Sequence, residues 1–179
     1  MKKLILAAVA ATALVPAAHA QERRFEPYVG VMSGWDQHNK TETKAGIPPL
    51  GYDGWMVEGV VGANVNVAGP IVLGVEGSAS KGIRGDIDWD YGVKGRAGVK
   101  AGKDSMIFGT VGYKWINFDA LGKDSRDFHG TTYGFGAEVS PVDLGLSNAD
   151  SSNLRLRLQV ETLGNFNSVR PMAGVVAKF

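Results

Sequence analysis

The sequence contains no cysteine, which excludes disulfide bonds, catalytic thiols and thiolate metal sites. It also lacks an excess of either charge, since 19 basic and 18 acidic residues give a formal net charge of +1. That balance argues against a dedicated nucleic-acid binder, which is basic on one face. Histidine is scarce, with 3 in 179 residues, and none lies at a spacing typical of zinc ligands. We therefore expect no cofactor.

A hydrophobic run long enough for a transmembrane helix is missing as well. The longest apolar run, residues 4–15, falls short of the roughly 20 residues that such a helix needs. It follows Lys2 and Lys3 and precedes Pro16 and the small-residue pattern Ala18-His19-Ala20. This order predicts a cleaved signal peptide over residues 1–20, followed by one domain over 21–179. A short N-terminal membrane anchor is the alternative.

What the remaining chain does have is a polar–apolar alternation with a period of two. It is clearest over Leu154–Leu163, where charged or amide residues occupy positions 155, 157, 159 and 161. That period is typical of a strand with two different faces. Similar segments cover residues 28–35, 55–65, 73–80, 91–101, 106–115, 132–139 and 169–179. The pattern predicts an all-β protein, an eight-stranded antiparallel up-and-down barrel.

The predicted connections alternate in length. Long polar segments at residues 37–53, 81–90 and 117–130 are separated by short ones at 67–70 and 102–104. A rhythm of long outer loops and short inner turns is typical of transmembrane barrels. Two connections break the rhythm: residues 141–152 are long where a short turn is due, and residues 164–168 are short.

Aromatic residues favour a membrane barrel over a soluble one. A soluble ligand-binding barrel would turn its apolar face inward. Here tryptophan and tyrosine lie near strand ends on the apolar face, where they suit two belts at the membrane interfaces. The predicted interface residues are Trp35, Trp55, Tyr91, Tyr113, Trp115, Tyr133 and Phe179. Ordinary core aromatics are the alternative for any one of them.

Charged residues of both signs occupy the polar face. The interior of an eight-stranded barrel is just wide enough for side chains to fill it, and glycine on the same face leaves room for long ones. An inward charge needs a partner, so the balance of signs predicts a lumen network. Its predicted members are Glu58, Glu76, Lys94, Arg96, Glu138, Arg155, Arg157 and Glu161. The alternative is a solvated face of weak surface ion pairs.

Several short, glycine-rich segments carry a family resemblance: residues 28–35, 74–76, 109–115, 134–138 and the terminal Phe179. With them the chain resembles the small eight-stranded outer-membrane barrels of Gram-negative bacteria, near the transmembrane domain of outer-membrane protein A and the opacity-protein-like porin family. The resemblance implies that Phe179 forms part of the signal read by the barrel-assembly machinery. It also implies an interior acidic–basic network at Glu76, Arg96, Glu138 and Arg157. Pro171 departs from the pattern, and we expect a bulge or a late start of the last strand there.

The resemblance implies a non-enzymatic protein of the cell outer membrane. A plugged lumen is indicated by the equal numbers of acidic and basic inward residues, and we expect a role in membrane integrity, adhesion or surface contact through the long loops. Expected partners are outer-membrane lipid and lipopolysaccharide, the barrel-assembly machinery and an extracellular partner of the loops, with no nucleic acid. We expect a monomer.

Three alternatives stay open. A narrow porin-like channel for small solutes needs an open lumen. A lipid A-modifying enzyme is less favoured, because His129-Gly130-Thr131 lacks the serine that such barrels pair with histidine. A weak divalent-cation site at Asp86, Asp88 and Asp90 is weighed against a solvated strand tip, which we favour.

Overall fold

The computed structural model describes residues 25–38, 53–84, 87–118, 128–146, 153–164 and 168–179. The predicted signal peptide lies outside them. The eight predicted strands are confirmed: β1 (Phe25–His38), β2 (Asp53–Ala68), β3 (Ile71–Arg84), β4 (Ile87–Lys100), β5 (Met106–Phe118), β6 (Phe128–Val139), β7 (Leu154–Leu163) and β8 (Ser168–Lys178). Most run past the predicted ends by a few residues.

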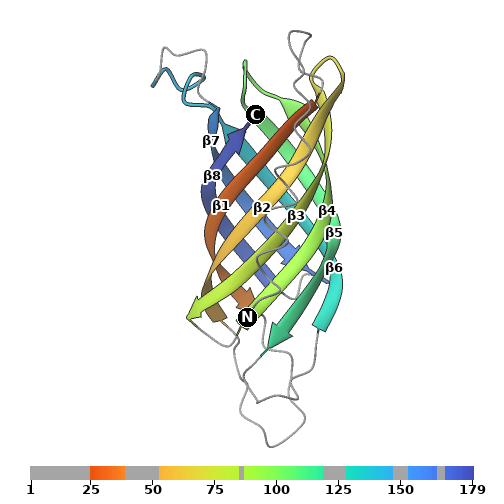
Figure 1. The fold of residues 1–179 in the computed structure, drawn as a ribbon, viewed down its shortest axis with the longest axis vertical. Coiled ribbons are helices and arrows are strands. Elements are labelled where there is room, and N and C mark those ends of the chain that lie inside the picture. The colour runs from red at the N-terminus through yellow and green to blue at the C-terminus, as the bar shows by residue number, and fades with distance from the viewer. Residues whose placement is uncertain (1–24, 39–52, 85–86, 119–127, 147–152, 165–167) are drawn as a thin grey trace, which may run out of the picture.

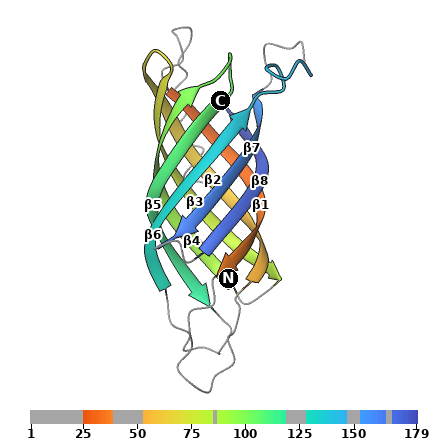
Figure 2. The ribbon, with the colours of Figure 1, turned by 180° about the vertical axis from the view of Figure 1, so that it is seen from behind.

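The strands form a closed antiparallel barrel, as predicted. Each strand pairs with its neighbours in the chain, and β8 returns to pair with β1. Figure 1 shows β1 to β4 crossing the front at a tilt, and Figure 2 shows β5 to β8 behind them. We call the end that carries the β2–β3, β4–β5 and β6–β7 connections the turn end, and the opposite end the loop end. No described helix is long and apolar enough to cross a membrane.

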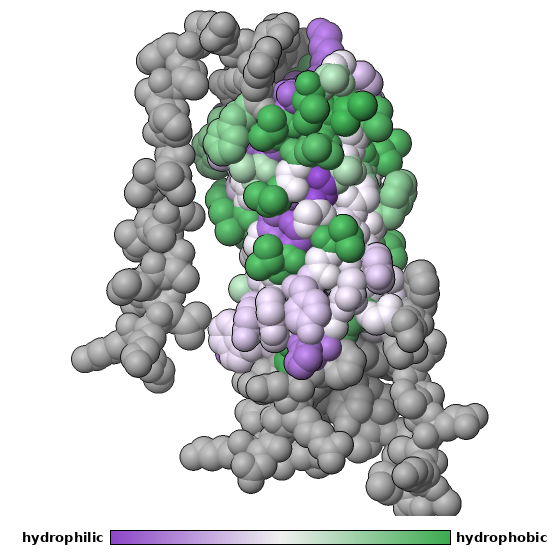
Figure 3. All heavy atoms as spheres, turned by 90° about the vertical axis from the view of Figure 1, so that its right-hand side faces the viewer, coloured by the Kyte–Doolittle hydropathy of each residue, from purple (hydrophilic) through white to green (hydrophobic). Residues whose placement is uncertain are grey.

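Side chains alternate between the two faces of the sheet. In β7 the even-numbered leucines face outward and are exposed, whereas Arg155, Arg157, Gln159 and Glu161 face inward and are buried. The outer face is apolar over most of its height. Figure 3 shows one side, where green hydrophobic side chains cover the strands and paler ones gather nearer the loop end. An apolar outside and a charged inside fit a barrel surrounded by lipid.

The connection predicted over residues 81–90 is mostly strand, so that loop prediction is wrong. β3 runs to Arg84 and β4 begins at Ile87, with Ser80 paired to Asp90 and Lys81 paired to Trp89. Lysine, glycine, arginine and aspartate made this segment resemble a solvated loop. The alternation of inward and outward side chains nevertheless continues over residues 81–83 of β3 and 89–90 of β4.

Pro171 causes neither of the expected irregularities. β8 begins at Ser168, and its ladder with β7 continues in one register through Val160 and Pro171. Its ladder with β1 keeps the same register but has no pair between Gly34–Met172 and Gln37–Val169. Proline has no N–H to donate, so the barrel accommodates it by leaving two ladder positions unpaired rather than by shifting register.

The long β6–β7 connection folds over a neighbouring turn. Asp143 accepts hydrogen bonds from the backbone N–H groups of Lys103, Asp104 and Ser105, at 3.0, 3.0 and 2.8 Å, and from the Ser105 hydroxyl at 2.6 Å. Gly102 has a φ of 104°, and a Cβ there would lie 2.9 Å from the Asp143 carboxyl carbon. Only glycine therefore suits this turn. The connection that breaks the length rhythm holds the β4–β5 turn in place.

We expect an Asp143→Asn variant to lose stability in a pH-dependent way. The Ser105 hydroxyl and the three N–H groups hold the pKa of Asp143 at about 2, below its ordinary value of 3.8. A lowered carboxyl pKa stabilises the folded state above the ordinary pKa, and that contribution disappears as the pH falls through about 2. Urea midpoints of both proteins should differ above pH 4 and converge near pH 2. A gap that does not change with pH would contradict the assignment.

Candidate functional site

The interior of the barrel is the most charged part of the described molecule. All eight residues predicted for a lumen network lie inward with buried side chains. Five further charged residues of the strands are buried beside them: Asp36, Asp90, Lys114, Arg170 and Lys178. The ion pairs among these residues fall into three layers between the loop end and the turn end.

The middle layer joins two arginines to two glutamates. Arg157 donates to Glu138 at 2.6 Å and also to Glu76. Arg96 donates to Glu138 at 2.7 Å and lies 3.7 Å from Glu76. The Tyr28 hydroxyl donates to Glu76 at 2.8 Å. Five side chains from β1, β3, β4, β6 and β7 thus meet across the lumen, and these include the four residues that the family resemblance indicated.

Two aromatic rings fill the space around this layer. The guanidinium of Arg96 lies 4.0 Å from the centre of the Phe108 ring, and that of Arg157 lies 5.4 Å from it. Both guanidiniums lie 5.1 Å from the Tyr28 ring. Arginine favours such stacking on ring faces. The rings hold the guanidiniums in position and exclude water from their faces.

The layer toward the loop end is built on two lysines. Lys114 lies 3.2 Å from Glu58 and 3.1 Å from Glu161. Lys94 lies 3.2 Å from Glu161, 3.6 Å from Glu58 and 3.2 Å from Glu76, which links this layer to the middle one. Thr132 donates to Glu161 at 2.6 Å. Each lysine serves several carboxylates, as three donors on one ammonium allow.

Nearest the loop end, Arg170 bridges two aspartates. Its guanidinium contacts Asp36 through two nitrogens and donates to Asp90 at 2.8 Å. The Ser80 hydroxyl lies 2.7 Å from Asp90 and 3.0 Å from Glu58, so this cluster continues into the lysine layer.

The placement of Asp90 bears on the candidate cation site. Its side chain is buried inside the barrel and paired with Arg170, so the favoured solvated strand tip is wrong for Asp90. The side chains of Asp86 and Asp88 lie outside the described part of the chain. Within that part, no group of histidine or acidic residues could hold a metal ion.

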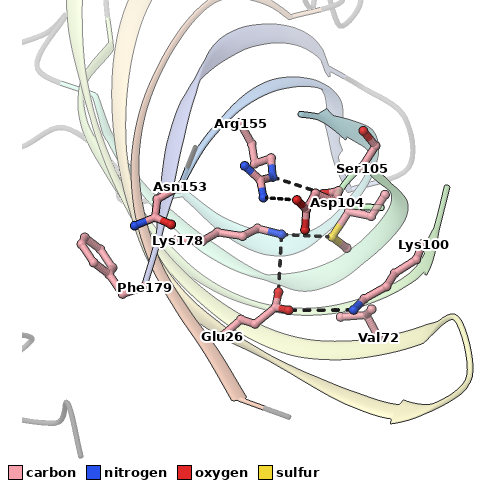
Figure 4. A pocket seen from close by; sticks show the side chains of 10 residues that line it. Glu26, Val72, Lys100, Asp104, Ser105, Asn153, Arg155, Lys178 and Phe179 are labelled. Carbon is pink, nitrogen blue, oxygen red and sulfur yellow. Dashed lines mark hydrogen bonds and ion pairs between the residues drawn. The ribbon is translucent and has the colours of Figure 1, made fainter. Parts of the chain in front are cut away.

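At the turn end the interior opens into a small cavity (Figure 4). Lys178 lies 3.0 Å from Glu138 and 3.7 Å from Glu26 at this mouth. Arg155 lies 3.2 Å from Asp104, which is 46% exposed. Lys100, Met106 and Phe179 are among the other residues that line the cavity. The Arg155–Asp104 and Lys100–Glu26 pairs of this cavity are the most exposed ion pairs of the described interior and therefore the weakest.

Two apolar clusters lie beside the charged layers. Met56, Ile116 and Leu163 pack together near the loop end, and Val72, Met106 and Phe108 pack near the turn end. An ion pair gains strength where water is excluded, but an unpaired charge is costly there. These apolar neighbours thus make the pairing beside them more important for stability.

The side chains missed by sequence reasoning follow the same parity as those that it identified. Asp36 continues the inward series of Gly30 and Gly34, and Lys114 continues that of Thr110 and Gly112. The predicted strand 28–35 ended one residue too early to include Asp36, whereas Lys114 lies inside the predicted strand 106–115, on its inward face. Extending the first alternation by one residue, and following the second to its end, would have found both.

The seven predicted interface aromatics all face outward, but they do not form two equal belts. Six lie toward the loop end, and Phe179 lies at the turn end. Trp35 packs edge-to-face on Trp55 at 5.9 Å, and Tyr91 stacks on Trp115 at 5.4 Å between ring centres. The expectation of two belts thus fits the loop end better than the turn end.

His129 belongs to this outer surface. It is exposed, and its ring is hydrogen-bonded through Nδ1 to the Tyr113 hydroxyl. The candidate base of a lipid-modifying enzyme therefore lies on the outer face of the barrel, away from the polar interior.

Several known proteins share this architecture. A family model described as outer membrane protein beta-barrel domain matches residues 4–143. No curated protein matches the sequence. Among solved structures, a de novo designed transmembrane β-barrel has 18% identity, a TM-score of 0.50, and coverage of 89% of this chain and 98% of its own. Neisserial surface protein A has 15% identity, a TM-score of 0.53, and coverage of 86% and 97%.

A third structure, that of the attachment invasion locus protein Ail of Yersinia pestis, has 13% identity and a TM-score of 0.47, with coverage of 87% and 99%. At these identities the first two structures show a shared fold and no more. The family model covers most of the sequence, including the first six strands. The chain therefore belongs to the outer membrane protein β-barrel domain family and is an outer-membrane protein of Gram-negative type.

Proposed function

We propose that this protein is a non-enzymatic barrel with a plugged lumen, which supports the integrity of the outer membrane and displays its loops at the cell surface. The observation that carries the proposal is the charge balance of the three layers. Six carboxylates (Asp36, Glu58, Glu76, Asp90, Glu138, Glu161) meet the five cations of the layers (Lys94, Arg96, Lys114, Arg157, Arg170), and Lys178 at the turn-end mouth pairs with Glu138 as the sixth cation. All are buried, and apolar side chains pack beside the network near both of its ends.

Ion passage would require these pairs to separate. An ion that enters the lumen must replace its hydration shell with protein groups, and here the groups already bind one another. Removing one partner from a buried pair is strongly unfavourable. The geometry therefore supports a plug more than the alternative of a narrow channel.

The test is conductance of the purified protein in planar lipid bilayers. We expect no steady openings above the lipid leak, whereas an open porin inserted under the same conditions conducts. Insertion is checked on a detergent gel, because a closed barrel stays folded in cold detergent and shifts on boiling. Steady openings that scale with salt concentration would overturn the plug and favour the channel.

The architecture of the barrel supports the proposed role at the cell surface. Rigid strands hold connections at the loop end, and loops on a rigid scaffold are where binding residues accumulate. We propose adhesion or contact with an extracellular partner for these loops, together with contacts to lipopolysaccharide. A single chain closes the sheet without a free edge, which supports a monomer.

Phe179 is proposed as the assembly signal. Its side chain is 53% exposed at the turn end, and its N–H donates to the carbonyl of Pro27 at 2.9 Å. A terminal aromatic that stays exposed after the barrel closes is accessible to the barrel-assembly machinery.

A further inference from the structure

One cation of the barrel wall points away from the interior. Among the strand residues whose side chains are described, Lys81 is the only lysine, arginine, aspartate or glutamate on the outward face. A cation on that face is costly at the bilayer midplane and tolerated near the headgroups. Its position near the loop end of β3 therefore requires a headgroup environment.

The side chain of Lys81 is held by a neighbouring strand. Lys81 pairs across the ladder with Trp89 of β4, and its Nζ lies 4.6 Å from the centre of the Trp89 ring. That indole is 38% exposed. The contact holds the ammonium against the barrel wall and leaves donors free for an external acceptor.

The neighbouring surface has the character of a lipid interface. Tyr91, two residues along β4 on the same face, stacks on Trp115, and Tyr113 packs on that tryptophan at 4.9 Å. Exposed tyrosine and tryptophan favour the headgroup level of a membrane. Lys81 thus lies at the depth where lipid phosphates are found.

We propose that Lys81 and Trp89 form a binding site for a phosphate of lipid A in the outer leaflet. The ammonium would pair with the phosphate, and the indole would pack on the adjoining sugar or acyl chain. This inference refines the lipopolysaccharide contact of the proposed function. It depends on the loop end facing the cell exterior, as in barrels with short periplasmic turns, and not on the state of the lumen.

The test is binding of diphosphorylated lipid A to the folded protein in detergent, measured by native mass spectrometry. We expect Lys81→Ala to weaken the first bound lipid about fivefold, the effect of one cation near an anionic lipid surface. Lys81→Arg should retain binding, and Trp89→Leu should weaken it. Lys103→Ala is the matched control, because Lys103 is exposed in the β4–β5 turn at the opposite end.

Folding of each variant is checked by its gel shift on boiling. Equal affinity of Lys81→Ala and the parent, or an equal loss in Lys103→Ala, would overturn the site. Phosphatidylglycerol serves as the second lipid and should show a smaller dependence on Lys81. If both lipids lose affinity equally, Lys81 attracts any anionic headgroup and the assignment to lipid A is wrong. None of these results depends on conductance. A failure of the Lys81 site can therefore be distinguished from a failure of the proposed lumen plug.

Discussion

Replacing Arg157 by leucine should lower the free energy of unfolding by about 3–5 kcal/mol, the cost of breaking a buried ion pair from one side. Arg157 is fully buried and is shared by Glu76 and Glu138. Leucine fills part of the volume but leaves both carboxylates with fewer partners, where water cannot replace the lost hydrogen bonds. The measurement is a urea titration of the refolded barrel in detergent micelles.

Arg155 supplies the matched control, since it precedes Arg157 by one inward position on β7. Asp104, its ion-pair partner among the described residues, is 46% exposed and can be hydrated when the arginine is removed. Arg155→Leu should therefore cost about 1 kcal/mol or less. Equal losses for the two variants would show that pairing in the buried middle layer contributes no more to stability than pairing at the hydrated turn end.

A double variant separates charge from volume. Adding Glu138→Gln to Arg157→Leu removes one of the two carboxylates left without a full set of partners. If unpaired charge causes the loss, the double variant should be more stable than the sum of the single effects predicts. Strict additivity would instead assign the loss to packing.

The strands and their inward faces could be predicted because alternation is a local signal. A residue two positions along a strand returns to the same face, so β7 alone indicates that Arg155, Arg157 and Glu161 point the same way. Strand ends were less predictable, because the polar residues 81–90 have the composition of a loop while their pairing continues the sheet.

The pairing inside the barrel could not be predicted from local pattern. Arg157 meets Glu76 across 81 positions of sequence, and which inward residues face one another depends on the stagger of the closed sheet. Charge balance indicates that partners exist without identifying them. The same limit applies to Asp143, whose hydrogen bonds to the β4–β5 turn arise from the neighbouring positions of two connections far apart in the chain.

The second large effect on the free energy of unfolding is expected when an inward-facing glycine is replaced by alanine. Gly62 faces inward on β2, and a Cβ there would lie 2.5 Å from both Tyr28 Cζ and the Val75 carbonyl oxygen, and would overlap the Tyr28 hydroxyl. Contacts this short require the neighbours to move. Overpacking a filled interior costs about 1–3 kcal/mol, and we expect Gly62→Ala to lose that much in the urea titration.

Gly59 of the same strand is the control, because it faces outward and a Cβ there meets nothing closer than 3.9 Å. Both changes add one methyl group to β2, so backbone preference affects them alike. We expect Gly59→Ala to change stability by less than about 0.5 kcal/mol. Similar losses at both positions would assign the effect to the backbone rather than to the filled lumen.

The neighbour that resists the added methyl group is Tyr28, and its anchoring explains why. Its hydroxyl is bonded to Glu76, and its ring faces the guanidiniums of Arg96 and Arg157. Tyr28→Phe removes the hydroxyl that lies nearest the new Cβ and releases the ring from Glu76. The Tyr28→Phe, Gly62→Ala double variant should therefore recover part of the loss caused by Gly62→Ala, beyond additivity. If it recovers nothing, the Val75 backbone rather than the charged interior limits the size of residue 62.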